Sequence, residues 1–254
     1  MTIPNLFSLI GTSWDFFRKQ PVLNGVLLWF IALPMMAMTL IDMATEAFPV
    51  FQDITNRGVI LGETDFRPLL AYIVIEILLS LVMLWGIACI LLVGKRLTVN
   101  RAGRTRSSLK TVRKEAVAFI LPLLLTSILR SCFTFLWALL FIVPGVIYYI
   151  RTMFYHVALV CEGHPYRSAL QRSSQIVRGA TWKALGAMLG LSVVLFFPVI
   201  MIASILDTIA QRLDPRLLVA TAVIDSGLFA IVLVLFTISM ILLYNELKKT
   251  SPSA

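Results

Sequence analysis

The chain has 254 residues, of which 59% are hydrophobic and only 14% are charged. Soluble domains carry about 25% charged residues, and here the apolar residues are gathered into long runs that leave no segment for a soluble domain of normal size. The formal net charge is +9, but the basic residues flank apolar runs without interleaved aromatic residues, so membrane topology explains them better than nucleic-acid binding.

The first twenty residues predict an amphipathic helix that lies in the membrane interface. Its apolar side chains recur at alternating spacings of three and four, which places them on one helical face. They are Ile3, Leu6, Phe7, Ile10, Trp14 and Phe17. Polar residues such as Asn5, Thr12 and Asp15 lie off that face, so the helix is too polar to span a bilayer.

Six apolar segments follow along the chain, and each predicts a transmembrane helix. They are residues 22–41, 69–93, 116–143, 146–161, 184–206 and 218–243. We expect Pro34 to kink the first helix and Pro144-Gly145 to separate the third from the fourth. The predicted fold class is an all-α polytopic membrane bundle of about six transmembrane helices plus the interfacial helix, in a single domain over residues 1–254.

The connecting segments differ in charge. Two are prominent: a hydrophilic linker over residues 94–115, and a short capped amphipathic helix over residues 165–178. Sixteen Lys and Arg residues fall in the segments 1–20, 94–115, 162–183 and 245–254, whereas four fall in the segments 43–68 and 207–217. By the positive-inside rule, this bias places both the N-terminus and the C-terminus in the cytosol.

Residues that carry chemistry are few. The chain has no Gly-rich phosphate loop, no G-x-S-x-G elbow and no H-E-x-x-H pair. His156, Cys161, Glu162 and His164 are close in sequence, but a structural metal site needs four ligands at tighter spacing, so we interpret them as boundary residues. The three cysteines, at 89, 132 and 161, lie in or at the end of apolar runs, which argues against a disulfide framework. No metal or cofactor is expected.

Four ionisable residues fall inside the predicted spans: Glu76, Arg130, Arg151 and Asp225. Charges are costly in hydrocarbon, so such residues are either functional or part of a structural ion-pair network, and both readings stay open. Estimated depths place three of the four at one level. We therefore expect Arg151 to face the bundle interior and to pair with Glu76 or Asp225.

The cytosolic segments also predict contacts with lipid. Ten basic residues are candidates for binding anionic head groups, at about 1 kcal/mol each, although the same charges also set the topology. They are Arg101, Arg104, Arg106, Lys110, Arg113, Lys114, Arg167, Arg172, Arg178 and Lys183. Gly186 and Gly190 share a helix face and predict close packing within the chain.

A pattern within residues 143–183 resembles a known family. It consists of Val143-Pro-Gly-Val-Ile-Tyr-Tyr-Ile-Arg151, Phe154, Glu162, Ser168-Ala-Leu-Gln-Arg-Ser173 and Arg178-Gly179. The pattern is similar to that of the membrane domain of glycerophosphoryl diester phosphodiesterase-like proteins and of the related YciC-like bacterial inner-membrane proteins. In that group the phosphodiesterase is a separate soluble barrel, for which this chain has no room. The resemblance therefore implies a fold and a location, the bacterial cytoplasmic membrane, and supplies no catalytic residues.

Three functional hypotheses follow from these observations. The first is a non-enzymatic membrane protein that interacts with lipids or amphipathic molecules in envelope homeostasis. The second is a transporter or permease component, suggested by the charges inside the spans and by the proline-broken helices. The third, a membrane-embedded lipid enzyme, is the weakest because the sequence shows no nucleophile or metal constellation.

Overall fold

Every element that the structure describes is helical. A computed structural model describes residues 5–45, 66–99, 108–214 and 216–250. The helices are α1 (Leu6–Lys19), α2 (Val22–Val26), η1 (Leu27–Ala32), α3 (Leu33–Thr45), α5 (Arg67–Val99), α6 (Leu109–Leu140), α7 (Ile142–Arg151), α8 (Tyr155–Glu162), α9 (Arg167–Val177), α10 (Thr181–Leu213) and α11 (Leu217–Thr250). By length and composition, six helical segments of the described chain could cross a membrane, in agreement with the prediction.

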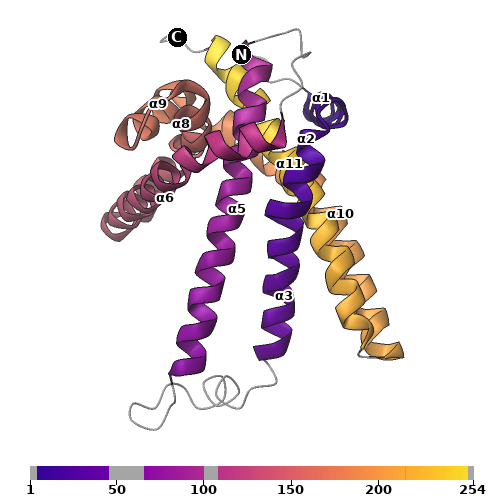
Figure 1. The fold of residues 1–254 in the computed structure, drawn as a ribbon. Coiled ribbons are helices and arrows are strands. Elements are labelled where there is room, and N and C mark those ends of the chain that lie inside the picture. Colours follow the sequence, from indigo (N-terminus) through magenta and orange to yellow (C-terminus); the bar gives the residue numbers. More distant parts are fainter. Residues whose placement is uncertain (1–4, 46–65, 100–107, 215, 251–254) are drawn as a thin grey trace.

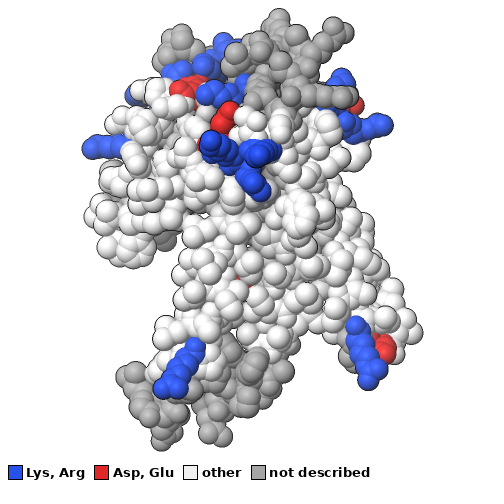
Figure 2. All heavy atoms as spheres, in the orientation of Figure 1, with Lys and Arg blue, Asp and Glu red and all other residues white. Residues whose placement is uncertain are grey.

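Charged side chains mark the two ends of the molecule. In Figure 1, α1, α9 and the C-terminal end of α11 lie at the upper end, from which α3, α5 and α10 run downward. Figure 2 shows Lys and Arg gathered at the upper end and present at two separate places at the lower end, with a nearly uncharged band between them. We call the upper end the basic end. Many large apolar side chains are exposed, among them Ile77, Phe197 and Ile202, as expected of a surface that faces lipid.

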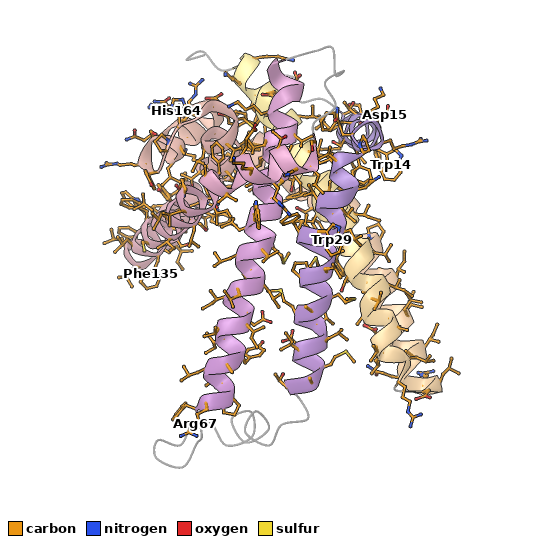
Figure 3. The ribbon with its side chains drawn as sticks, viewed as in Figure 1. Trp14, Asp15, Trp29, Arg67, Phe135 and His164 are labelled. Atoms are coloured by element: carbon orange, nitrogen blue, oxygen red, sulfur yellow. The ribbon has the colours of Figure 1, made fainter. Side chains whose placement is uncertain are left out.

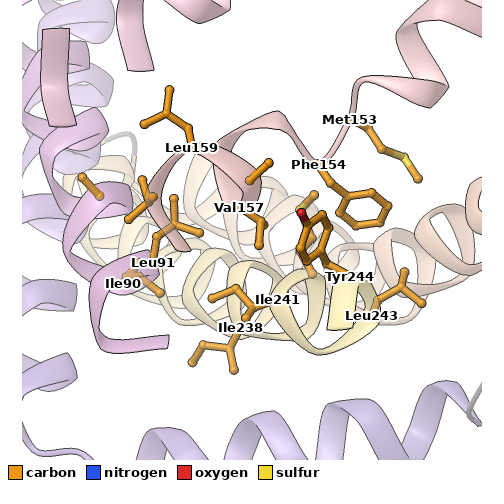
Figure 4. Close-up of a cluster of buried hydrophobic side chains, with 14 of the residues drawn as sticks. Ile90, Leu91, Met153, Phe154, Val157, Leu159, Ile238, Ile241, Leu243 and Tyr244 are labelled. Carbon is orange, nitrogen blue, oxygen red and sulfur yellow. The ribbon is translucent and has the colours of Figure 1, made fainter. Parts of the chain in front are cut away.

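The main buried cluster lies toward the basic end, where α5, α8 and α11 meet. Figure 4 shows its side chains, with Ile90 and Leu91 from α5, Val157 and Leu159 from α8, and Ile238, Ile241 and Tyr244 from α11. All of these are at most 2% exposed. Since α8 is only eight residues long and buries Val157, Ala158, Leu159 and Val160, it depends on this packing rather than on its own length for stability.

The irregularity predicted at Pro34 takes the form of a π-helical turn. Proline has no N–H to donate, and its ring crowds the carbonyl four residues earlier, which here belongs to Phe30. The wider turn of η1 ends two residues before Pro34, at Ala32, and accommodates that crowding. A Cβ at Gly86 would lie 2.9 Å from Phe30 Cβ, so glycine is what allows α5 to approach η1.

The break between the third and fourth spans is displaced from its predicted position. The chain leaves α6 at Phe141, which has extended backbone angles, and Pro144 then lies in the first turn of α7, where its missing N–H costs nothing. Gly145 serves close packing instead of a turn: a Cβ there would lie 2.8 Å from the Ala138 backbone. In Figure 3, Phe135 marks the end of α6 that leaves the rest of the bundle.

The segment predicted as one span over residues 146–161 is two helices. Helix α7 ends at Arg151, a turn follows at Thr152–Phe154, and α8 begins at Tyr155. Helices α5, α10 and α11 extend beyond their predicted spans at both ends, because they continue past their apolar stretches into polar ends. Helix α6 begins before its predicted span of residues 116–143 but ends earlier, at Leu140.

Helix α1 packs across α11 at the basic end and keeps part of its apolar face exposed. Its buried residues are Leu9, Ser13 and Phe16. The hydroxyls of Ser13 and Ser239 are 2.8 Å apart, a buried hydrogen bond that joins α1 to α11. Phe7 is 70% exposed and Trp14 is 43% exposed, so these two residues of the predicted apolar face point away from the protein. Protein contact therefore combines these buried residues with Leu6, Ile10 and Phe17 from the predicted apolar face, which are partly buried against the core.

Candidate functional site

The turn between α7 and α8 is held by one side chain from α9. Ser173, fully buried, donates a hydrogen bond to the Arg151 carbonyl at 2.9 Å and accepts one from the Phe154 N–H at 3.1 Å. A helix break inside a protein leaves backbone donors and acceptors that need new partners, and this hydroxyl supplies both. Three residues of the family-like pattern thus meet at a single backbone junction.

Arg130 reaches the same turn from α6. Its Nε donates to Thr152 Oγ1 at 3.1 Å, and one terminal nitrogen donates to the Tyr149 carbonyl at 3.0 Å. The guanidinium carbon lies 4.1 Å from the centre of the Tyr149 ring and 5.3 Å from that of Tyr155. The Tyr149 carbonyl near the end of α7, the Thr152 hydroxyl and two aromatic faces therefore stabilise this cation in place of a carboxylate.

A second polar cluster ties three elements together at the basic end. Glu162, the last residue of α8, accepts hydrogen bonds from Arg172 Nε on α9 at 2.8 Å and from Lys248 Nζ on α11 at 2.7 Å. His164 Nε2 lies 3.6 Å from the same carboxylate. Gly163 has a left-handed backbone conformation, with φ +78°, that ends α8 and turns the chain back toward α9. The bond to Glu162 raises the pKa of the Arg172 guanidinium above its ordinary value.

Tyr244 closes this cluster on its apolar side. Its ring centre lies 5.8 Å from that of Phe154, and its buried hydroxyl lies close to Glu162 and Arg172. Figure 4 shows the two rings side by side. The Glu162 cluster is thus continuous with the main buried cluster below it.

Between α6, α7 and α9 lies a cavity of about 550 Å³ with one apolar and one polar side. Its lining residues are Phe133, Trp137, Tyr148, Thr152, Arg167, Leu170, Gln171, Ser174 and Gln175. The aromatic side chains come from α6 and α7, while the amides, the hydroxyl of Ser174 and the cation of Arg167 come from α9. Because Thr152 also receives the hydrogen bond from Arg130, the cavity and the turn share a wall.

The four residues predicted to form one charge network are not brought together. Within the described part of the chain, none of Glu76, Arg130, Arg151 and Asp225 takes part in an ion pair, so the expected pairing of Arg151 is not formed. Arg130 has the carbonyl and aromatic partners given above. Arg151 has a buried Nε without a hydrogen-bond partner.

Glu76 and Asp225 each lie instead one turn after a hydroxyl residue of the same helix, and that hydroxyl binds an acid on a neighbouring helix. Tyr72 donates a hydrogen bond to Asp42 at 2.9 Å, and Glu76 follows one turn later on α5. In the same way, Thr221 donates to Asp207 at 2.6 Å, and Asp225 follows one turn later on α11. Glu76 and Asp225 each keep one buried carboxylate oxygen with no hydrogen-bond partner. The two helical hairpins thus repeat one arrangement of an acid, a hydroxyl and a second acid, which the sequence analysis missed because the first acid and the hydroxyl are far apart in the chain.

The residues predicted to contact anionic lipid fall into three groups. Arg101, Arg104 and Arg106 lie outside the described residues. Exposed side chains on the basic end are those of Lys110, Arg113, Lys114, Arg167, Arg178 and Lys183. Arg172 is the exception, because its side chain is only 19% exposed and is paired with Glu162, so it binds protein where we expected lipid.

The remaining predictions divide as follows. Gly190 packs closely, since a Cβ there would lie 2.6 Å from Leu6 on α1, whereas a Cβ at Gly186 would meet nothing within 4 Å. Only one of the two glycines thus has the predicted packing role. Cys161 Sγ approaches the Leu91 carbonyl at 3.7 Å, and the described residues hold no group of three His, Cys, Asp or Glu arranged for a metal.

Comparison with protein-family models, characterised proteins and solved structures found no match to this chain. The resemblance of residues 143–183 therefore depends on those residues alone. Ser173, Arg172 and Glu162 were visible within that pattern, but the contacts of Tyr149 and Tyr155 with Arg130 were not, because a ring over a guanidinium leaves no spacing signal in the sequence.

Proposed function

We propose that this chain is a multi-pass protein of the bacterial cytoplasmic membrane that binds anionic, amphipathic lipids without catalysing a reaction on them. The observation that supports this most is the cavity between α6, α7 and α9. Its aromatic side suits acyl chains, and Arg167 with the polar side chains of α9 suits a charged head group. A role in envelope homeostasis is the physiological setting that we favour.

The proposed orientation places the basic end in the cytosol, with both termini there. Support comes from the clustering of Lys and Arg at the end of the molecule that carries α1, α9 and the end of α11 (Figure 2). Fusing alkaline phosphatase or a fluorescent protein after Lys249 tests it. Fluorescence without phosphatase activity is the expected result, and an active phosphatase would reverse the orientation and remove the cytosolic lipid site.

The lipid site is tested by measuring which lipids remain on the purified protein. We expect phosphatidylglycerol to bind more tightly than phosphatidylcholine, and Arg167→Gln to weaken phosphatidylglycerol binding about fivefold, since one cation near a membrane surface is worth about 1 kcal/mol. Arg178→Gln is the matched control, because Arg178 caps the same helix and is exposed but does not line the cavity. Equal losses in the two variants would show that only general surface charge attracts the lipid.

The linker makes a separate contribution that the same assay resolves. If Arg101, Arg104 and Arg106 contact head groups, replacing all three with Gln reduces retention of phosphatidylglycerol more at low salt than at moderate salt. Unchanged retention at both salt concentrations would leave these residues as a topology signal alone.

A transport role is the second candidate. The observation that favours it is the repeated acid–hydroxyl–acid arrangement of the two hairpins, since carboxylates inside spans are typical of ion and proton pathways. The test is proton movement into proteoliposomes, reported by a pH-sensitive dye enclosed in them. A dye response that is lost in Asp225→Asn, with folding preserved, would favour transport over lipid binding alone.

A further inference from the structure

A groove between α5 and α6 lies apart from the lipid cavity described above. It encloses about 500 Å³ and is lined mainly by apolar side chains, including Ile77, Leu81 and Leu84 of α5 and Leu124 of α6. Glu76 lines it at one end of this apolar stretch. From Glu76 to Leu84 the helix rises roughly 12 Å, so the groove is elongated along α5.

Glu76 gives this groove an unbalanced negative character. Its Oε1 is buried and has no hydrogen-bond partner. Asp42, the nearest acid on α3, lies close enough to interact electrostatically and already accepts a hydrogen bond from Tyr72, which also lines the groove. None of the described lining residues is basic. A buried carboxylate oxygen is satisfied only by a proton or by a donor from outside the chain.

We propose that this groove binds a cationic amphiphile, an alkylammonium whose head group pairs with Glu76 and whose chain lies along Ile77, Leu81 and Leu84. The charge of the head group complements the carboxylates of Glu76 and Asp42, and the apolar wall excludes water from the chain. An ammonium also donates three hydrogen bonds, enough for the free oxygen of Glu76 and for the hydroxyl of Ser80 on the groove wall. This site is independent of the proposed anionic-lipid site, since the two share no lining residue.

The second hairpin provides a matched control within the same chain. Asp225 also has one buried, unpartnered carboxylate oxygen and also follows a hydroxyl that binds another acid. It does not line the groove. Removing the charge of Asp225 therefore tests whether any intramembrane carboxylate attracts the amine, or whether the groove around Glu76 is needed.

The experiment is equilibrium binding of radiolabelled dodecylamine to the purified full chain in a neutral maltoside detergent at pH 7.5, where the amine is charged. We expect Glu76→Gln to bind at least about tenfold more weakly and Asp225→Asn to bind as the wild type does. Leu84→Trp, which keeps the carboxylate but fills the groove, is expected to weaken binding as well. Unlabelled dodecylamine should displace the label far better than dodecanol, which has the same chain without the charge.

Thermal unfolding of each variant shows whether it is folded, and Leu84→Trp decides the question should Glu76→Gln not fold. The proposal is overturned if Glu76→Gln or Leu84→Trp binds like the wild type. It is equally overturned if dodecanol competes as well as the amine, which would mean adsorption to the apolar surface only, or if Asp225→Asn weakens binding as much as Glu76→Gln. Retention of phosphatidylglycerol at the other cavity is measured on the same variants and should not change.

Discussion

Removing the charge of Glu162 should weaken the contacts between α8, α9 and α11 at the basic end. In Glu162→Gln, Arg172 and Lys248 each lose the charged partner that they contact at 2.8 and 2.7 Å. A hydrogen bond to a charged group contributes about 1.5–3 kcal/mol when it is largely removed from water. The Arg172 bond belongs to this class, because its two side chains are 19% and 14% exposed.

The Lys248 bond must be discounted, since its side chain is 41% exposed and water screens the pair. We assign it less than about 1 kcal/mol. The two contributions together predict a loss of about 1.5–4 kcal/mol for Glu162→Gln. The effect should fall on the junction of α8, α9 and α11, since these are the elements that the carboxylate connects.

The measurement is a double-mutant cycle on the free energy of unfolding, determined by titration with sodium dodecyl sulfate in mixed micelles. Arg172→Gln should cost about 1.5–3 kcal/mol in the wild type and much less in the Glu162→Gln background. Lys249→Gln is the control, because Lys249 and Glu246 form an exposed pair one turn apart, worth less than about 0.5 kcal/mol. If Arg172→Gln costs the same in both backgrounds, the two residues are not coupled and the argument fails.

Three further outcomes are expected. Gly145→Ala should destabilise the chain by about 1–3 kcal/mol, because the new methyl group meets α6 backbone. Gly186→Ala is the control and should be neutral or stabilising, because nothing lies near its new methyl group. Equal melting temperatures of the two variants would contradict this expectation. In a variant with Trp14 as the only tryptophan, depth-dependent quenching should place the ring at head-group level, and full exposure to water or burial at the bilayer centre would refute an interfacial α1. The destabilisations caused by Arg151→Leu and Glu76→Leu should be additive, since no ion pair joins the two residues, and a coupling energy above about 0.5 kcal/mol would show that they interact.

Hydrophobic patterning was enough to predict most of the architecture. Long apolar runs such as residues 69–93 and 218–243 predict membrane-length helices, because the hydrocarbon thickness sets the length and an unpaired backbone is too costly in lipid for any other open structure. The helix break near Pro144 and the end of the short amphipathic helix over residues 165–178 were also visible, since both are local effects of backbone geometry. The structure places the break itself at Phe141 and gives Gly179, just after that helix, a φ of +90°.

The partners of charged groups could not be read in this way. From sequence, Arg130 and Glu76 looked like members of one ion-pair network because their formal charges balance. The structure instead gives Arg130 the carbonyl of Tyr149 and two aromatic faces, and sets Glu76 beside Asp42 and Tyr72. Carbonyl dipoles and ring faces carry no formal charge, so counting charges cannot predict them.

By itself, the sequence determined that the chain is helical, where its long apolar segments lie, and which of its segments are basic, because these depend on composition and on periodicities of a few residues. Only the tertiary structure decided that Ser173 supports the turn after Arg151, that Glu162 joins Arg172 to Lys248, and that cavities open against α6 on two sides. These features depend on which helix faces meet, and residues as distant in the chain as Glu162 and Lys248 become neighbours only through packing.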